Sequence, residues 1–282
     1  MLLQSEKRDH QLSIKTYHPL ISEFLCRYYR WIDHPSKLRI LRYLEMLLGE
    51  RRIIATTIYG FLMAVDKNDL IQRSILYERL WESDLSILLA QELTEEDIFL
   101  DIGANVGYFT CFALAHQVKQ VIACEPDPLN CEILTLNLNL NGFDSKKVIL
   151  LEKGLGRSQG RLTFNRSHVA NTGVSGFNAC NAVATFEVEI DTLDNLIDCG
   201  NIPAPTVVKM DVEGWEEQVL RGAFNLLQYQ PPRLIIFEAI CDADGVIINQ
   251  KLVEILRNFG FVITQSLLSD YGCNHVAKFN AV

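Results

Sequence analysis

Along residues 98–279, short apolar runs typical of buried strands alternate with segments whose apolar residues have the spacing of a helix. Short apolar runs, of a length that suits a buried strand, lie at 98–102, 120–124, 147–152, 206–211 and 233–239. Shorter β-rich runs lie at 161–165, 185–190, 261–265 and 275–279. Segments with apolar residues at helical spacing lie between them, at 106–117, 128–140, 214–227 and 247–259. The pattern predicts an α/β fold: a doubly wound, mostly parallel, Rossmann-like sheet with helices on both faces.

The first hundred residues follow a different pattern. Helical spacing recurs on both sides of Pro35, and two β-rich runs flank Tyr59 and Gly60 in a way that predicts a hairpin. The helices are expected at 18–31, 36–48, 70–77 and 84–93, and the hairpin strands at 53–58 and 61–65. We therefore expect three parts: a helical extension at 1–52, a β-hairpin with lid helices at 53–97, and a cofactor-binding domain at 98–282.

Composition narrows the class of protein. The chain has 282 residues, of which 49% are hydrophobic, and no apolar run is long enough to predict a transmembrane helix. Its eight cysteines form no C-x-x-C pair, and Cys111 and Cys124 lie in apolar patterns, so a reducing, cytoplasmic location is expected. The net charge of -9 argues against nucleic-acid binding.

The charge is unevenly distributed. Residues 1–52 contain ten Lys/Arg and six Asp/Glu, whereas the rest of the chain is strongly acidic. A basic amino-terminal part could contact a membrane surface or an acidic partner, or it could simply be a solvated helix face.

The segment from Ile98 to Thr110 carries the clearest chemical signal. An apolar run ends in Asp101, a loop with Gly103 and Gly107 follows, and a helical pattern then begins, as at a nucleotide-type cofactor site. Gly103 would allow close approach of a ligand, and Gly107 would allow the helix to start close to the strand. Asn105 replaces the middle glycine of the dinucleotide fingerprint, and an acidic strand end suits an ammonium group better than a diphosphate.

Glu125 ends the next apolar run and is expected at the tip of the neighbouring strand. A carboxylate there accepts hydrogen bonds from the two hydroxyls of a ribose. An amine partner at Asp101 and a ribose partner at Glu125 together suit S-adenosylmethionine. Alternatively, Asp101 caps the following helix and Glu125 is a solvated strand end.

At these residues the chain resembles the FkbM-type methyltransferases, a branch of the class I S-adenosylmethionine-dependent fold. The resemblance spans roughly residues 50–265. It rests on the ordered blocks Tyr59-Gly60-Phe61, Asp101-Ile-Gly-Ala-Asn-Val-Gly107, Glu125-Pro126-Asp127-Pro128, Asn137-Leu-Asn-Leu-Asn141, Asp191-Thr-Leu-Asp194 and Val208-Lys-Met-Asp-Val-Glu-Gly214. The resemblance implies methyl transfer, most often to an oxygen of a sugar, polyketide or other small metabolite.

Roles can be assigned on this basis. The residues expected to bind the cofactor are Asp101, Gly103, Ala104, Asn105, Gly107, Tyr108, Glu125, Pro126, Asp127, Gly154 and Asp211, with Tyr77 and Glu82 in a lid. The candidates for catalysis are Asp211, Glu238 and His168. Asp211 with Glu213 or Glu238 could supply oxygen ligands to Mg²⁺ or Ca²⁺, but without a histidine-rich motif no metal is expected.

Several alternatives to these roles remain open. Asp211 could cap a helix, Glu238 could be a satisfied buried carboxylate, and Tyr77 and Trp81 could belong to the core. At the level of function, the alternatives are a nicotinamide-dependent oxidoreductase and a non-catalytic binding protein that keeps the fold. The expected partner is a small-molecule acceptor.

Overall fold

The computed structural model describes residues 16–17, 19–31, 33–47, 52–167, 175–177, 182–242, 246–269 and 272–280. Its centre is a seven-stranded sheet in the order β12-β13-β11-β10-β4-β5-β6. The strands are β4 (Ile98–Ile102), β5 (Gln120–Cys124), β6 (Val148–Leu151), β10 (Val207–Met210), β11 (Leu234–Glu238), β12 (Phe261–Ser269) and β13 (Gly272–Phe279). The five strands from β11 to β6 are parallel, and β12 and β13 form an antiparallel hairpin at one edge.

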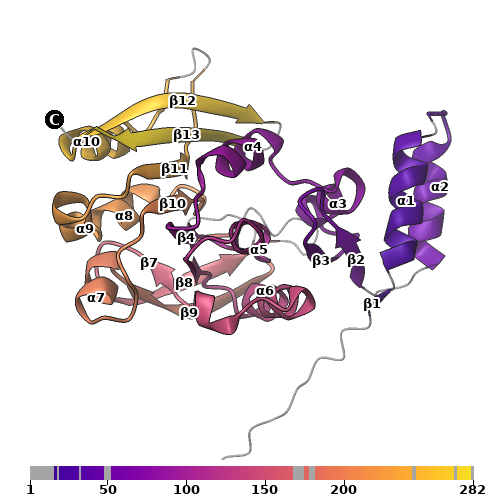
Figure 1. Ribbon diagram of the computed structural model, residues 1–282, viewed down its shortest axis with the longest axis horizontal. Coiled ribbons are helices and arrows are strands. Elements are labelled where there is room, and N and C mark those ends of the chain that lie inside the picture. Colours follow the sequence, from indigo (N-terminus) through magenta and orange to yellow (C-terminus); the bar gives the residue numbers. More distant parts are fainter. Residues whose placement is uncertain are drawn as a thin grey trace, which may run out of the picture.

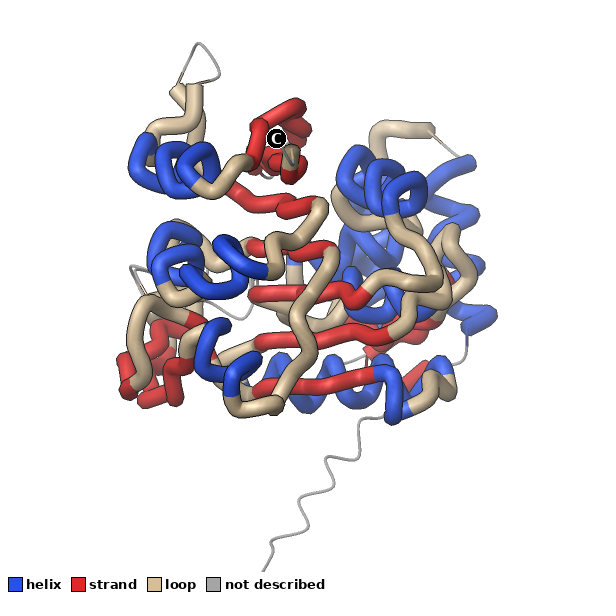
Figure 2. The backbone as a smooth tube through the Cα atoms, turned by 60° about the vertical axis from the view of Figure 1, so that its left-hand side comes forward, coloured by secondary structure: helices blue, strands red, loops and turns tan. Residues whose placement is uncertain are grey.

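Helices cover both faces of this sheet, as Figure 2 shows with the strands lying between two helical layers. One layer contains α4 (Ser83–Glu92), α5 (Tyr108–Ala115) and α6 (Pro128–Asn141), and the other contains α7 (Leu193–Asp198), α8 (Glu216–Arg221), α9 (Phe224–Tyr229) and α10 (Gln250–Asn258). The expected α/β class and mostly parallel sheet are therefore confirmed.

The order of the strands determines where a ligand can bind. From β4 the chain proceeds to β5 and β6 on one side, and it returns to β10 and β11 on the other. The carboxyl ends of β4 and β10 therefore flank a topological switch point, where the loops diverge and leave a crevice. A small second sheet, β7-β9-β8, lies after β6 and is formed by β7 (Gly154–Leu155), β8 (Gly160–Arg166) and β9 (Ala184–Asp191). A 3₁₀ turn, η1 (Ser145–Lys147), leads into β6.

The amino-terminal part packs beside this core (Figure 1). Two helices, α1 (Pro19–Trp31) and α2 (Lys37–Leu47), lie next to a small sheet of β1 (Thr16–Tyr17), β2 (Arg52–Thr56) and β3 (Leu62–Val65), and α3 (Leu70–Glu78) follows. The strands β2 and β3 pair antiparallel, as the hairpin prediction requires.

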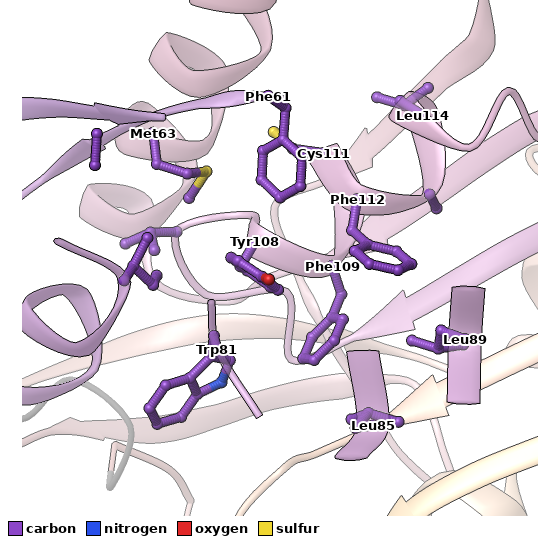
Figure 3. Close-up of a cluster of buried hydrophobic side chains, with 14 of the residues drawn as sticks. Phe61, Met63, Trp81, Leu85, Leu89, Tyr108, Phe109, Cys111, Phe112 and Leu114 are labelled. Atoms are coloured by element: carbon purple, nitrogen blue, oxygen red, sulfur yellow. The ribbon is translucent and has the colours of Figure 1, made fainter. Parts of the chain in front are cut away.

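A buried apolar cluster joins the hairpin and the lead-in helices to the cofactor-type loop (Figure 3). Phe61 and Met63 come from the hairpin, Trp81 and Leu85 from the lead-in, and Phe112 from α5. The hairpin is thus packed onto the helix that follows the first loop of the domain.

Two asparagines of α6 complete the edge of the small sheet. The Asn137 side-chain oxygen accepts from the Ala64 amide at 2.7 Å, and the Asn141 oxygen accepts from the Leu62 amide at 2.7 Å. The Asn141 side-chain amide also donates to the Leu62 carbonyl at 2.8 Å. These amides pair with β3 as a neighbouring strand would, which gives the Asn-Leu-Asn-Leu-Asn motif a structural role.

Several elements differ from the sequence prediction. The helix expected at 214–227 is two helices, α8 and α9, because the chain turns at Gly222, where a Cβ atom would lie 2.0 Å from the Gly156 carbonyl oxygen. The helix α7, which Thr192 caps, was not predicted. The helix expected at 106–117 is shorter, because Gly107 forms its N-cap with φ +85°.

Candidate active site

A cavity lies at the carboxyl ends of the parallel strands, at the switch point. The loops after β4, β5, β10 and β11 contribute its walls, together with the lead-in to α4 and the small second sheet. Of the residues predicted for the site, its lining contains Glu82, Gly103, Ala104, Asn105, Tyr108, Glu125, Pro126, Gly154, Asp211 and Glu238.

Gly103 lets the first loop pass directly against the end of β10. Its φ is +76°, and a Cβ atom there would lie 1.9 Å from the backbone oxygen of Asp211. Only glycine fits such a contact. The close approach predicted for Gly103 is therefore made to the chain itself, and it brings the first loop and the Asp211 loop together around the cavity.

Gly107 serves packing and does not line the cavity. A Cβ atom at this position would lie 2.7 Å from Leu134 Cγ, so the glycine lets the start of α5 approach α6. Gly107 was expected to bring the helix close to the strand, but the neighbour that requires glycine here is the helix α6.

Glu125 follows β5 directly and is buried at the cavity wall. Its Oε2 accepts from the Asn105 amide at 2.8 Å, and its Oε1 accepts from the Asp127 amide at 2.9 Å and from Asn130 Nδ2 at 3.3 Å. Burial raises the pKa of Glu125 to about 7, against the opposing effect of these backbone hydrogen bonds. A carboxylate oxygen accepts about two hydrogen bonds, so Oε2 keeps capacity for a ligand hydroxyl.

Asp101 lies behind the cavity wall and does not line it, and its contact with an amine stays a prediction. The side chain is completely buried, where Oδ2 accepts from the Thr110 hydroxyl at 2.7 Å and Oδ1 lies 3.8 Å from Lys209 Nζ. Lys209 lies directly opposite Asp101 in the register of β10 and β4. Asp101 therefore compensates a buried lysine.

Lys209 links this buried pair to the cavity. Its Nζ donates to Asp211 Oδ2 at 3.3 Å and lies 5.2 Å from the centre of the Phe109 ring. Burial alone would lower the pKa of Lys209, but the carboxylates of Asp211, Asp101 and Glu82 raise it above its ordinary value. Lys209 is thus a fixed cation that orients Asp211.

Three carboxylates converge at the far wall of the cavity. One oxygen each of Asp211, Glu213 and Glu238 lies within 4.8 Å of the others, and all three residues line the cavity. Burial, with the charge of Asp211 next to it, raises the pKa of Glu213 to about 8, and the same causes raise the pKa of Glu238. These oxygens are the donor type that a hard divalent cation prefers, and they would equally suit an organic cation.

The loop before α4 closes the cavity from the amino-terminal side. Trp81 and Glu82 line it, and Glu82 Oε1 accepts from Asn274 Nδ2 at 3.1 Å. The second oxygen, Oε2, is buried and has no hydrogen-bond partner among the described residues. The same is true of the side-chain oxygen of Asn105, which also lines the cavity. Both oxygens can accept hydrogen bonds from a ligand.

Tyr77 is a clear correction to the expected lid. Its hydroxyl donates to Glu45, its ring packs against Tyr29 with the ring centroids 4.8 Å apart, and it does not line the cavity. The side chain belongs to the amino-terminal core. Both Tyr77 and Trp81 belong to one buried apolar cluster, as the alternative prediction had it. Only Trp81 lines the cavity, because α3 ends at Glu78 and Arg79 takes a left-handed conformation with φ 62°.

Backbone strain gathers around the cavity. Positive φ values at non-glycine residues are uncommon, and such conformations cluster at functional sites. The described residues with this feature are Arg79, Glu82, Asn105, Gln117 and Glu213. Of these, Glu82, Asn105 and Glu213 line the cavity.

The remaining predicted residues have other places. Asp127 does not line the cavity, because its carboxylate caps α6 through the Leu129 amide and is ion-paired with Arg166. His168 lies outside the described residues. The side chains that the sequence reading missed include Phe177, which lines the cavity beside Gly154 and packs on Trp215 with ring centroids 5.1 Å apart. A single aromatic residue in an otherwise polar stretch was the signal available for it.

Comparison with known proteins identifies the family. A family model described as the methyltransferase FkbM domain matches residues 101–263. The chain belongs to the FkbM methyltransferase family. The resemblance read from its motifs is thereby confirmed.

Individual relatives match only in part. Hexuronic acid methyltransferase AglP from Haloferax volcanii is 34% identical over 147 residues, which are 52% of this chain and 58% of that protein. The crystal structure of methyltransferase FkbM from Methylobacillus flagellatus is 16% identical, with a TM-score of 0.49, over 92% of this chain and 58% of that one. The structure of TYW2 from M. jannaschii in complex with AdoMet is 15% identical, with a TM-score of 0.46, over 83% of this chain and 88% of that one. The chain thus spans less than two thirds of the length of the first two.

Among the helices of the described residues, none has the length and apolar character needed to cross a membrane.

Proposed function

We propose that this chain transfers a methyl group from S-adenosylmethionine to a hydroxyl of a sugar or similar small metabolite. The observation that carries the proposal is one cavity in which the Gly103 loop, Glu125 and the carboxylates of Asp211 and Glu238 meet. Membership of the FkbM methyltransferase family supports the reaction type. The hexuronic acid in the name of the relative AglP supports a sugar as acceptor.

The lining suits the proposed cofactor group by group. Glu125 would hold the ribose hydroxyls, and Gly154 and Leu155, beside Phe177, would border the adenine. The unpartnered oxygens of Glu82 and Asn105 are acceptors for an ammonium group. The cavity wall thus combines acceptors with an acidic region, which favours a ligand that carries positive charge.

When bound, S-adenosylmethionine supplies a methyl group on a sulfonium, whose neutral thioether is a good leaving group. The task left to the chain is to align the acceptor and remove its proton. Asp211, held by Lys209, would orient the acceptor hydroxyl. Glu238 lines the cavity beside Asp211 and would accept the proton in its ionised form. Because burial and the charge of Asp211 raise the pKa of Glu238, transfer should become faster as the pH rises. Glu213, whose oxygen lies within 4.8 Å of both, is the alternative base.

Calorimetry tests cofactor binding. Glu125→Ala should weaken binding of S-adenosylhomocysteine by at least about tenfold, since it removes the acceptor of a ribose hydroxyl hydrogen bond. Glu152→Ala is the matched control, because Glu152 is an exposed carboxylate after the next strand and does not line the cavity. An absence of binding to the folded wild-type chain, or equal loss in both variants, would contradict the proposal.

Transfer itself needs a second measurement. Incubation of the chain with isotopically labelled S-adenosylmethionine and a panel of glycosides should label a hydroxyl, and Glu238→Gln should slow labelling about a hundredfold with little change in cofactor affinity. Binding without transfer to any acceptor, together with an unchanged affinity in Glu238→Gln, would favour a non-catalytic binding protein. Tight binding of NADH in place of S-adenosylmethionine would favour an oxidoreductase.

A further inference from the structure

The outward face of α2 is apolar although it is exposed to solvent. The inward face of this helix is buried through Leu41 and Glu45. On the other side, Tyr43 is 57% exposed, Met46 66% and Leu47 62%. Residues three, four and seven positions apart share one side of a helix, so these three side chains form a continuous surface.

Exposed apolar side chains also occur at other positions of the two helices. Leu38 and Ile40 are also exposed on α2, and Phe24 is exposed on the neighbouring helix α1. Scattered single apolar residues are normal at a surface, but a group on two adjacent helices marks a contact site.

Only positive charge accompanies these side chains on the outward face of α2. Arg39 and Arg42 are exposed there, and neither is ion-paired with any residue that the structure describes. The one carboxylate of the helix, Glu45, faces inward, where it lies 3.3 Å from Arg73. On α1, Arg27 is 77% exposed at the side chain, although it pairs with Glu23.

We propose that the outward face of the α1–α2 pair docks on an anionic lipid surface. Helices that lie in a membrane interface combine apolar side chains, which enter the acyl boundary, with arginines or lysines that meet anionic headgroups. The face of α2 has both, and its exposed positive charges are complementary to such a surface.

A second copy of the chain is a poorer occupant. Symmetric pairing through this face would place Arg39 and Arg42 of both copies in one interface, and like charges gathered at an interface oppose association.

The charge of the remainder of the chain would orient it on the membrane. Residues 53–282 are strongly acidic, so an anionic surface repels them while it attracts the basic helices. The chain would thus bind through α1 and α2, which lie at one end of the molecule in Figure 1.

Vesicle sedimentation tests this docking. The full chain is mixed with vesicles of phosphatidylcholine alone, or of phosphatidylcholine with phosphatidylglycerol, and the bound fraction is measured. We expect binding to the anionic vesicles only. Arg39→Gln with Arg42→Gln should reduce the partition coefficient on the order of thirtyfold, from about fivefold for each arginine near an anionic surface.

Two further variants separate charge from apolar contact. Met46→Ser with Leu47→Ser should weaken binding to anionic vesicles although it changes no charge. Lys251→Gln with Arg257→Gln removes the same charge from exposed positions of α10 and should bind as the wild type does. Melting curves of each variant verify that the fold is intact.

The remaining outcomes overturn the proposal. Failure of the wild type to bind anionic vesicles would do so, as would equal loss in the α2 and α10 charge variants. A concentration-dependent dimer in sedimentation velocity that Met46→Ser with Leu47→Ser abolishes would assign the face to a second copy of the chain.

Discussion

The cavity and the α1–α2 face both combine ionisable with apolar side chains, but with opposite charge and opposite exposure. Among the described residues around the cavity, carboxylates outnumber the two lysines, Lys153 and Lys209, and Asp101 and Asp211 flank the buried Lys209. On the outward face of α2, Arg39 and Arg42 are exposed beside apolar side chains that nothing described covers.

The difference separates two uses of charge. Inside the fold a charge is costly, so it is paired, or its pKa shifts. At a surface a charge costs little, and it acts mainly on what approaches from solvent. Removal of a cation should therefore have large structural consequences at the cavity and small ones on α2.

The largest effect is expected from Lys209→Met. This change leaves Asp101 buried without its cation, and the free energy of unfolding should fall by about 3–5 kcal/mol. Urea unfolding measures the change. Lys146→Met at an exposed position should alter it by less than about 0.5 kcal/mol. Adding Asp101→Asn to Lys209→Met should restore part of the loss, and if it restores none, the two groups are not an interacting pair.

A smaller loss of stability is expected where α6 meets strand β3 of the hairpin. Asn137→Ala removes the side-chain acceptor of the Ala64 amide and should lower the free energy of unfolding by about 1–3 kcal/mol. The matched control is Asn139→Ala, at an exposed position of the same helix, which should change little. Equal effects of the two changes would mean that α6 does not complete the edge of β3.

Local pattern was sufficient for the parts of the site that depend on neighbours in sequence. Each parallel strand ended near the polar residue that marked it, so Glu125, Asp211 and Glu238 could be expected at the carboxyl ends of the parallel strands. The alternation of periods likewise predicted the α/β class.

The errors arose where the outcome depends on partners distant in sequence. The ion pair between Asp101 and Lys209 was not predicted, because the strand order, which places Lys209 directly opposite Asp101, is not visible in the sequence. Tyr77 was predicted for the lid, but its hydroxyl bonds to Glu45, which is distant in sequence. The alternative that Tyr77 and Trp81 belong to the core agrees with the buried cluster that contains both. Gly222 interrupts a predicted helix because of a contact with Gly156, which is distant in sequence.

The pH dependence of cofactor binding should further distinguish the acidic cavity from the α1–α2 face. The pKa of Glu213 is raised from 4.5 to about 8, so the group is protonated at neutral pH and ionises above it. Binding of the sulfonium cation should therefore tighten, by roughly tenfold, as pH rises from about 6.5 to about 9. Calorimetry in the presence of EDTA measures this. Glu213→Gln should flatten the pH profile of binding, whereas Glu189→Gln, at an exposed position of β9, should not.

Without a ligand, the free energy of unfolding should fall as the pH rises, whereas cofactor binding tightens. A carboxyl group whose pKa is higher in the folded than in the unfolded state favours folding while it is protonated. The contribution of Glu213 is therefore present at low pH and is lost progressively between 4.5 and about 8. A Glu213→Gln chain should lose less stability over this range than the wild type, and identical pH profiles would show that Glu213 does not titrate in the cavity.

The smallest effect is expected on α2, and its smallness is informative. Arg39→Gln with Arg42→Gln should change the free energy of unfolding by less than about 0.5 kcal/mol, because neither side chain pairs with a described residue. Urea unfolding of this variant and of Lys209→Met compares the two regions by the same free energy of unfolding. A loss above about 1 kcal/mol would mean that these arginines hold the fold together. The face could then no longer be regarded as free to dock, whereas an unchanged stability leaves its positive charge available to an external partner.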